Sequence, residues 1–296
     1  MTERKPAAEL IHHPYQPPAG FASPAVAVHK GSSVFFEDVA ALKCVRWADR
    51  DAYTYGLHGT PTTFALEARL ATLEGAQHVL LAPSGLAALN LVNQSLLKSG
   101  DQLLIPDNVY GPSRNSARHE LAGWGIDHAV YDPLDPADLA AKLTSATRLV
   151  WLEAAGSITL EFPDLMGLIA AVRAGAPQAL IALDNTWGAG LAFDAFALGV
   201  DLTLHALTKY PSGGGDVLMG SVATRDRSLF ERLAATHGRS GLGVGANDVE
   251  LVLRGLATLP LRYAAQDAAA RRVAAWAQQH PAVAQVLHPA LPGSPG

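Results

Sequence analysis

The stretch HVLLAPSGL, residues 78–86, determines the fold class that the sequence predicts. Its first five residues form a short apolar run that is typical of a buried strand. The run leads through Pro83, Ser84 and Gly85 into a helix that begins at Leu86. A strand followed at once by a helix is the repeating unit of α/β proteins. The rest of the chain is therefore expected to repeat this unit.

The same alternation is found along most of the chain. A helix is predicted to begin at Thr62, with Glu67 in its capping box. Further helices are predicted at 111–121 and 164–173, and apolar strands at 102–105, 148–153, 179–184 and 201–206. Apolar strands separated by helices indicate a mainly parallel sheet that is buried on both faces. Ligands of such sheets bind beyond the carboxyl ends of the strands, so catalytic and ligand-binding residues are expected directly after each strand.

The N-terminal segment has a different texture. It is irregular and rich in proline, yet it carries Tyr15, Val26, Val28, Phe35 and Phe36, which are costly to leave in water. We therefore favour an arm that docks on another surface over a mobile tail.

The end of the chain is predicted to be helical. Apolar residues at helical spacing predict helices at 247–259 and 262–279, and Pro260 marks a break between them. An apolar run at 283–287 predicts a strand. Because this strand has no local partner, it is interpreted as the beginning of a second domain.

Composition excludes several classes of protein. The chain has 296 residues, a formal net charge of −5 and 49% hydrophobic residues, which argues against disorder and against a nucleic-acid partner. No apolar run approaches the roughly 18 to 20 residues of a membrane span, and no signal peptide is apparent. Cys44 is the single cysteine, and we interpret it as a buried small hydrophobic residue. A cytoplasmic α/β enzyme is the default.

Three strand ends carry residues that are suited to chemistry. Ser84, Gly85 and Leu86 bring free backbone N–H groups to the N-terminus of a helix, an arrangement that is suited to bind phosphate. The Ser-Gly pair also occurs in such turns for steric reasons alone. Asp184 ends a strand and either caps the next turn or holds a ligand. Lys209 follows another strand in LTLHALTKYPSGGGD, a position unusual for a solvated lysine and suited to a nucleophile.

Together these are the parts of a pyridoxal-phosphate (PLP) site. The lysine binds the cofactor covalently, the acid keeps the pyridine nitrogen protonated and the turn holds the phosphate. Tyr110, just after the strand at 102–105, can stack on the ring. Other motifs are missing or weak: the glycine-rich stretch 241–245 does not follow a strand, and the histidines form no cluster with metal-ligand spacing.

Seven stretches in order resemble the Cys/Met-metabolism family of PLP enzymes. They are YGLHGTPT (55–62), LAPSGLAAL (81–89), NVYGPS (108–113), EAAGSITLE (153–161), DNTWGAG (184–190), TKYPSGGGD (208–216) and HPALPGSPG (288–296). The resemblance implies an α/β fold like that of aspartate aminotransferase (fold type I), with a large PLP-binding domain. Trp187 and the run GSIT at 156–159 resemble the β-lyase branch, because γ-acting members usually have Phe and Asn-Pro at these places.

The resemblance implies a role for each matched residue around the ring. Lys209 would form the Schiff base with the cofactor and take the α-proton of the substrate. Asp184 would pair with the pyridinium nitrogen, and Tyr110 would stack on the ring.

It also implies how the phosphate is held. Ser84, Gly85 and Leu86, together with the hydroxyl of Thr208, would bind it. Tyr55 would reach the site of a neighbouring subunit, since the family assembles as dimers or tetramers with shared active sites.

Two departures from the family pattern stand out. Leu57 occupies the place of an arginine that binds the phosphate across the dimer. Members also continue into a small C-terminal domain that supplies an arginine for the substrate carboxylate. The expected organisation is an N-terminal arm (1–54), a PLP-binding large domain (55–245), and connecting helices with the first strand of an incomplete C-terminal domain (246–296).

The activity implied by the resemblance is the cleavage of cystathionine to homocysteine, pyruvate and ammonia. A less selective lyase for cysteine or cysteine S-conjugates is an alternative, and a γ-acting enzyme is a weaker one. A fragment that binds only the cofactor or a partner is the alternative from another class. The implied ligands are PLP and a small amino-acid substrate, with no metal.

Overall fold

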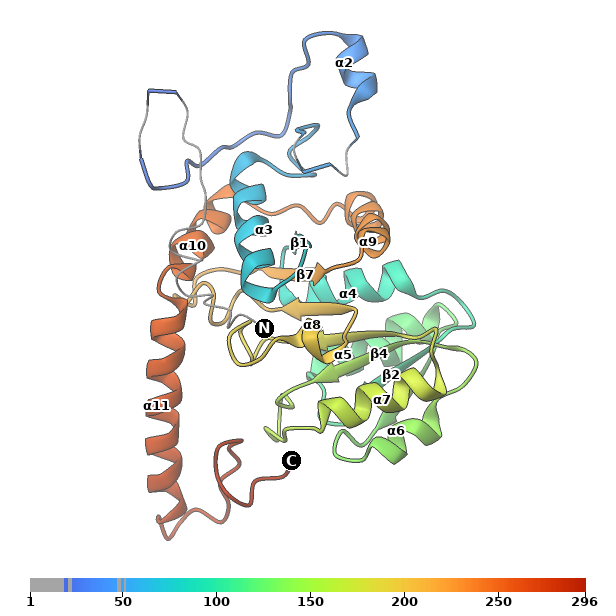
Figure 1. The fold of residues 1–296 in the computed structure, drawn as a ribbon, viewed down its shortest axis with the longest axis vertical. Helices are drawn as coiled ribbons and strands as arrows, with labels where there is room; N and C mark the ends of the chain where they lie inside the picture. Colours follow the sequence, from blue (N-terminus) through green and yellow to red (C-terminus); the bar gives the residue numbers. More distant parts are fainter. Residues whose placement is uncertain (1–18, 21–22, 47–48, 51) are drawn as a thin grey trace. The chain divides into compact units, whose positions relative to one another are not determined.

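The computed structural model describes residues 19–20, 23–46, 49–50 and 52–296 (Figure 1). The chain forms two compact units. Unit 1 consists of Met1–Ser95 and His205–Leu259, and unit 2 consists of Leu96–Leu204 and Pro260–Gly296. Each unit has its own strands and its own buried apolar residues.

Unit 1 is built on an antiparallel pair of strands. Strand β1 (His78–Ala82) pairs with β7 (Gly220–Thr224), so that His78 lies opposite Thr224 and Ala82 opposite Gly220. The helices of this unit are α2 (Val39–Cys44), α3 (Pro61–Glu74), α4 (Gly85–Leu96), α9 (Arg227–Ser240) and α10 (Ala246–Leu256). Helices α3 and α9 pack on β1, where Phe230 of α9 stacks on the ring of His78 with centroids 4.8 Å apart.

Helix α3 begins earlier than the sequence predicts. Thr60 is its N-cap: the Thr60 side chain accepts a hydrogen bond from the Thr63 backbone, and the Thr63 side chain accepts one from the Thr60 backbone. Pro61 fits the first helical position because its missing N–H would have no partner there. Glu67 takes no part in the cap; it is buried and forms an ion pair with Arg50 at 3.1 Å.

The N-terminal arm is only partly docked. Its backbone binds the start of α3, where the His29 N–H donates to Thr62 Oγ1 at 2.7 Å. Helix α2 buries none of its residues, and Phe35 is 98% exposed. Cys44, at the end of α2, is exposed, so the prediction of a buried cysteine is wrong. Tyr15 lies outside the described residues.

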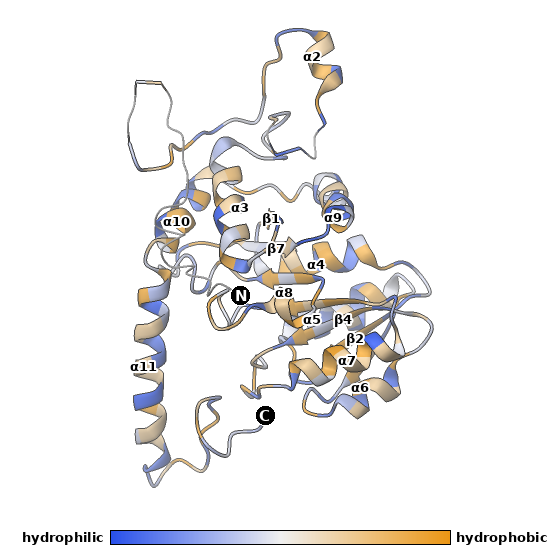
Figure 2. Cartoon of the chain, in the orientation of Figure 1, coloured by the Kyte–Doolittle hydropathy of each residue, from blue (hydrophilic) through white to orange (hydrophobic). Residues whose placement is uncertain are grey.

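Unit 2 contains a parallel sheet. Its strands are β2 (Gln102–Pro106), β3 (Asp127–Tyr131), β4 (Thr147–Glu153), β5 (Leu180–Asp184) and β6 (Leu202–His205), in the order β3-β2-β4-β5-β6. The helices that connect these strands are α5 (Gly111–Ser116), the π-helix η1 (Ala117–Leu121), α6 (Pro136–Lys142), α7 (Leu165–Gly175) and α8 (Ala195–Leu198). The central strands are almost wholly buried. The ribbon of α7 is mostly orange in Figure 2 because most of its residues are apolar. The predicted mainly parallel sheet is confirmed.

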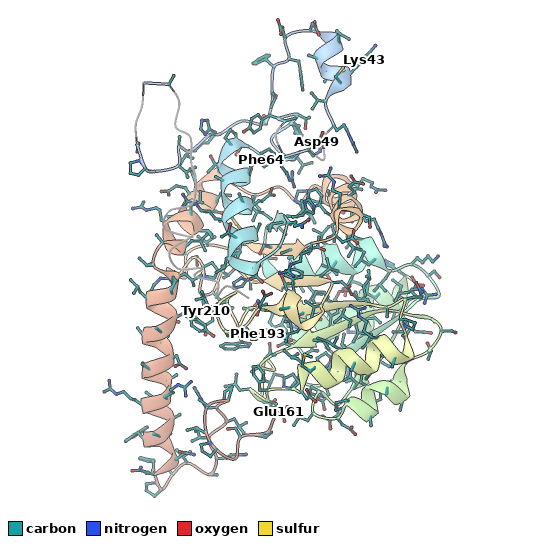
Figure 3. All side chains as sticks on the ribbon, in the orientation of Figure 1. Lys43, Asp49, Phe64, Glu161, Phe193 and Tyr210 are labelled. Carbon is teal, nitrogen blue, oxygen red and sulfur yellow. The ribbon has the colours of Figure 1, made fainter. Side chains whose placement is uncertain are left out.

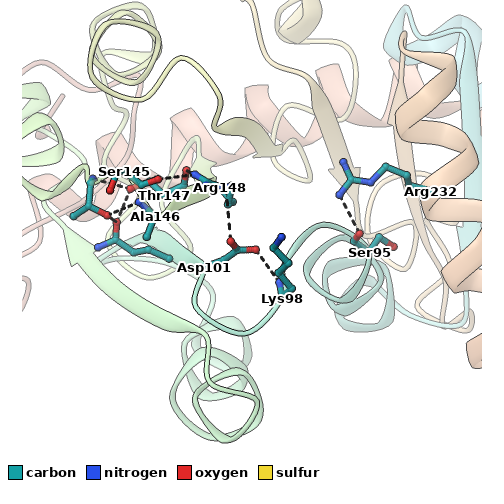
Figure 4. A network of polar contacts seen from close by, with 10 residues as sticks. Ser95, Lys98, Asp101, Ser145, Ala146, Thr147, Arg148 and Arg232 are labelled. Carbon is teal, nitrogen blue, oxygen red and sulfur yellow. Dashed lines mark hydrogen bonds and ion pairs between the residues drawn. The ribbon is translucent and has the colours of Figure 1, made fainter.

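Polar contacts join β2 and β4 at their amino ends (Figure 4). Asp101 accepts a hydrogen bond from the Lys98 backbone at 2.9 Å and lies 3.7 Å from Arg148 Nε. Thr147 Oγ1 donates to Gln102 Oε1. The amino ends of these strands are thus used for stability, which leaves the carboxyl ends for chemistry.

The C-terminal part of the chain is helical, as predicted, up to residue 278. Helix α10 is followed by α11 (Leu259–Gln278), so that Pro260 lies in the first turn of α11. Residues 283–287 form no strand, which corrects the prediction. A strand needs a neighbour for its backbone groups, and none in the described part of the chain pairs with these residues. No helix in the described residues is long and apolar enough to cross a membrane.

Candidate active site

In unit 1, the turn after β1 has the structure of an anion-binding loop. Helix α4 begins at Gly85, and the Ser84 side chain accepts a hydrogen bond from the Ala87 N–H at 3.0 Å. The N–H groups of Gly85 and Leu86 belong to the first helical turn, where no earlier carbonyl of the helix can accept from them. The positive end of the helix dipole lies at the same place, so this turn is suited to bind phosphate.

Two glycines allow close backbone approach around this turn. A Cβ on Gly85 would lie 2.9 Å from the Cβ of Ala206, and a Cβ on Gly220 would lie 2.5 Å from the Ser84 carbonyl oxygen. The turn is therefore held between the segment that follows β6 and the first residue of β7. Such a close, backbone-lined cradle fits a phosphate group, which is bound mainly through N–H donors.

The segment that holds the predicted lysine adjoins the cradle through Ala206. The Lys209 N–H donates to the Ala206 carbonyl at 3.0 Å, and the Lys209 carbonyl accepts from Gly213 at 3.1 Å. Thr208 Oγ1 donates to the Met219 carbonyl and accepts from the Met219 N–H, both at 3.2 Å. Unit 1 thus brings the predicted phosphate-binding residues and the predicted nucleophile to one place.

The side chain of Lys209 is exposed within the chain. The expectation that this position keeps a lysine from solvent is therefore wrong. The reason is that Lys209 lies in the turn beyond the strand, not in the buried sheet. Tyr210, the next residue, is labelled in Figure 3.

Tyr55 and Leu57 lie in the segment that leads into α3. Tyr55 forms a backbone bridge with Ser33, and its ring, 48% exposed, meets His58 edge-on at 6.2 Å. Burial and the charge of Arg50 hold the pKa of His58 below its usual value. With its pKa lowered, His58 does not supply at neutral pH the positive charge that the resemblance leads us to expect at position 57.

Unit 2 brings Asp184 and Tyr110 to the carboxyl end of its sheet. Asp184 is the last residue of β5, and Tyr110 is the N-cap residue of α5 after β2. Asp184 Oδ1 accepts from the Thr186 N–H at 3.0 Å, so the capping role considered for Asp184 is present. A carboxylate has two oxygens, so this cap is compatible with a second, ligand-binding role.

Glu153 joins these two residues, and the sequence reasoning did not identify it. It ends β4, pairs in register with Asp184, and its Oε2 accepts from the Tyr110 N–H at 3.0 Å. Burial, first, and the negative charge of Asp184, second, raise the pKa of Glu153 to about 8. The signal in the sequence is a charged residue that ends an otherwise apolar strand, RLVWLE.

The loop after Glu153 is fastened to the loop that carries Tyr110. Asn108 donates from Nδ2 to Glu161 Oε2 at 2.8 Å, and its carbonyl accepts from the Ser157 N–H at 3.2 Å. Glu161 also accepts from Thr159 Oγ1 at 2.6 Å. These hydrogen bonds join the two loops at this end of the sheet.

Two other sequence predictions can be compared with the structure. The glycine-rich stretch at 241–245 links α9 to α10: Gly241 ends the first helix and Gly245 caps the second, so the stretch follows a helix and not a strand. Within the described residues, no group of three His, Cys, Asp or Glu side chains is placed to hold a metal ion.

Known proteins are similar to this chain in sequence and in fold. Residues 7–296 match the family described as Cys/Met metabolism PLP-dependent enzyme. The cystathionine beta-lyase MetC of Escherichia coli strain K12 is 36% identical over 270 residues, which are 91% of this chain and 68% of that protein. A cystathionine gamma-synthase of Mycobacterium bovis is 32% identical over 294 residues, 98% of this chain and 73% of that protein.

A solved structure also matches the fold. The crystal structure of metB from Corynebacterium glutamicum superposes with a TM-score of 0.90 at 27% sequence identity, covering 98% of this chain and 73% of that one. The predicted fold class, an α/β fold of type I with a mainly parallel sheet, is confirmed.

Proposed function

Since the chain belongs to the Cys/Met metabolism PLP-dependent enzyme family, we propose that it is a carbon-sulfur β-lyase that acts on L-cystathionine. The products are homocysteine, pyruvate and ammonia. The observation that carries the cofactor assignment is the cradle of unit 1, where Gly85 at the start of α4 lies against Ala206, three residues before Lys209. The choice of β-elimination is supported by Trp187 and the GSIT run at 156–159, and by the similarity to the lyase of Escherichia coli.

The cradle and its neighbours would bind the phosphate. The N–H groups of Gly85 and Leu86 would donate to its oxygens, with Ser84 holding the turn in shape. The Thr208 hydroxyl, which contacts the Met219 backbone, would also donate to it. Binding by backbone donors at a helix N-terminus suits a dianion.

Three side chains would act on the ring and the substrate. The Lys209 amine would hold the cofactor and, once free, accept the α-proton of the substrate at Nζ. The Asp184 carboxylate would keep a proton on the ring nitrogen, and the Tyr110 ring would cover one ring face. PLP, when bound, supplies the electron sink that stabilises the charge left at the α-carbon.

We further propose a cytoplasmic protein that self-associates. Phe35, Val39 and Leu42 of the arm are exposed, and Tyr55 lies near them in the sequence with 48% of its surface exposed. A second copy would cover these apolar side chains and receive Tyr55 at its site.

One experiment tests the proposed reaction. The full chain is mixed with PLP, its visible absorption is recorded, and the keto acid formed from L-cystathionine is identified. We expect a visible band and pyruvate from the parent, and neither from Lys209→Ala. Formation of 2-oxobutanoate in place of pyruvate would show γ-elimination, and a visible band without any keto acid would show that the chain binds the cofactor only.

A further inference from the structure

Glu153 is a buried carboxyl group to which the proposed function assigns no role. It is the last residue of β4 and is 4% exposed. The parallel register places it directly beside Asp184, the last residue of β5. Two adjacent strands of unit 2 therefore end in carboxyl groups at the same edge of the sheet.

The contacts of Glu153 reach both loops at this edge. Its Oε2 accepts the Tyr110 N–H at 3.0 Å, ahead of the first turn of α5. Ser157, in the loop after β4, donates to the same carboxyl group from its backbone and from its hydroxyl. Tyr131 of β3 and Asp184 of β5 are the titratable groups near Glu153. The Tyr131 hydroxyl donates its hydrogen bond to the Trp151 carbonyl, at 2.8 Å, and not to Glu153.

Glu153 holds its proton more tightly than an ordinary carboxyl group does. Because Glu153 is buried and faces the negative charge of Asp184, its pKa is raised to about 8 in spite of the hydrogen bonds it accepts. Close carboxylates avoid carrying two negative charges, so a proton stays on one of them. In this pair, the burial and raised pKa of Glu153 favour the proton on Glu153.

We propose that Glu153 is a positioning residue of the cofactor site, an assignment that rests on the proposed function. Its carboxyl group fixes the backbone of Tyr110 and, by carrying a proton, leaves Asp184 as the anionic group for the ring nitrogen. It acts through Tyr110 and Asp184 and does not touch the reacting atoms itself.

The variants Glu153→Gln and Glu153→Ala separate the two effects. Glutamine is uncharged at every pH and can still accept the hydrogen bond of Tyr110, whereas alanine cannot. Glu161→Gln is the matched control, because it removes a negative charge from the same loop and keeps an acceptor for Asn108.

The first measurement needs no cofactor. Amide hydrogen exchange is followed at residue 110 in the full chain without PLP. We expect exchange about tenfold faster in Glu153→Ala, because the hydrogen bond that the Tyr110 N–H donates to Glu153 is lost. Rates should stay within about twofold of the parent in Glu153→Gln and in the control. Unchanged exchange in Glu153→Ala would overturn the proposal, whether or not the chain binds PLP.

The second measurement uses the chain with PLP. We expect the dissociation constant for PLP to rise about tenfold in Glu153→Ala and to stay within about threefold in Glu153→Gln. The visible spectrum of the parent should change near pH 8, and this change should vanish in Glu153→Gln but persist in Glu161→Gln. The assignment would be refuted if Glu153→Gln bound PLP as weakly as Glu153→Ala does. It would also be refuted if the spectrum of Glu153→Gln still changed near pH 8. A parent without any visible band would refute the proposed function instead, and the exchange rates would still decide whether Glu153 holds Tyr110.

Discussion

Gly220→Ala tests the phosphate cradle through its packing. A Cβ on Gly220 would lie 2.5 Å from the Ser84 carbonyl oxygen and 2.8 Å from Gly85 Cα. Both neighbours are backbone atoms, so the turn itself must move. Overpacking of this kind costs about 1 to 3 kcal/mol. If the cost appears as a distorted cradle, PLP binding should weaken by about 5- to 150-fold.

The assay is a titration of the cofactor-free chain with PLP, followed by visible absorption. Gly245→Ala is the matched control: Gly245 is in the same unit, has a φ of −74°, and has no atom within 4 Å of its added Cβ. The control should bind PLP as the parent does. A Gly220→Ala chain that is folded and binds PLP with unchanged affinity would refute the assignment of this turn as the phosphate site.

Three further predictions concern stability, each measured by denaturant unfolding. Tyr131→Phe removes a buried hydroxyl that donates to the Trp151 carbonyl at 2.8 Å. This change should lower the free energy of unfolding by about 1 to 2 kcal/mol at any pH below 9. An unchanged free energy of unfolding would contradict this prediction. Burial outweighs the attraction of Arg50 and raises the pKa of Glu67 to about 7, so the folded chain binds more protons than the unfolded one. The contribution of Glu67 to the free energy of unfolding should therefore fall by about 1.4 kcal/mol per pH unit between pH 4.5 and 7. Glu67→Gln should abolish this pH dependence. Burial lowers the pKa of His237 to about 4, so the contribution of His237 to the free energy of unfolding should fall as the pH drops from 6.5 to 4. The stability of His237→Gln should depend less on pH than that of the parent over this range.

The strands that the sequence predicts correctly have a continuous apolar centre. In β1 this centre is residues 79–81 and in β4 it is residues 149–152, and all of these residues are buried. Strand β3 was missed since it lies at the edge of the parallel sheet and begins with an exposed residue, Asp127. Strand β7, GSVAT, was missed because its residues are small, which a close approach to the cradle requires at Gly220.

The opposite error occurred at residues 283–287. The run VAQVL has the composition of a strand, but composition does not supply a neighbouring strand. Cys44 is a comparable case, because its predicted burial depended on packing that the short helix α2 does not provide.

The candidate site was predictable where it depends on strand ends. Ser84, Gly85, Asp184 and Lys209 each follow or end a strand that the apolar pattern locates. Glu153 was not predictable in the same way. Its raised pKa depends on its burial and on the register that places β4 beside β5, and both are properties of the folded sheet.

The most direct test of the account is the covalent attachment of the cofactor. The full chain is incubated with PLP, treated with borohydride to make any imine linkage permanent, digested and analysed by mass spectrometry. We predict a phosphopyridoxyl group on Lys209, with equal labelling in Gly245→Ala. Stoichiometric labelling of another lysine with none on Lys209, or no labelling of a folded chain, would contradict the central claim.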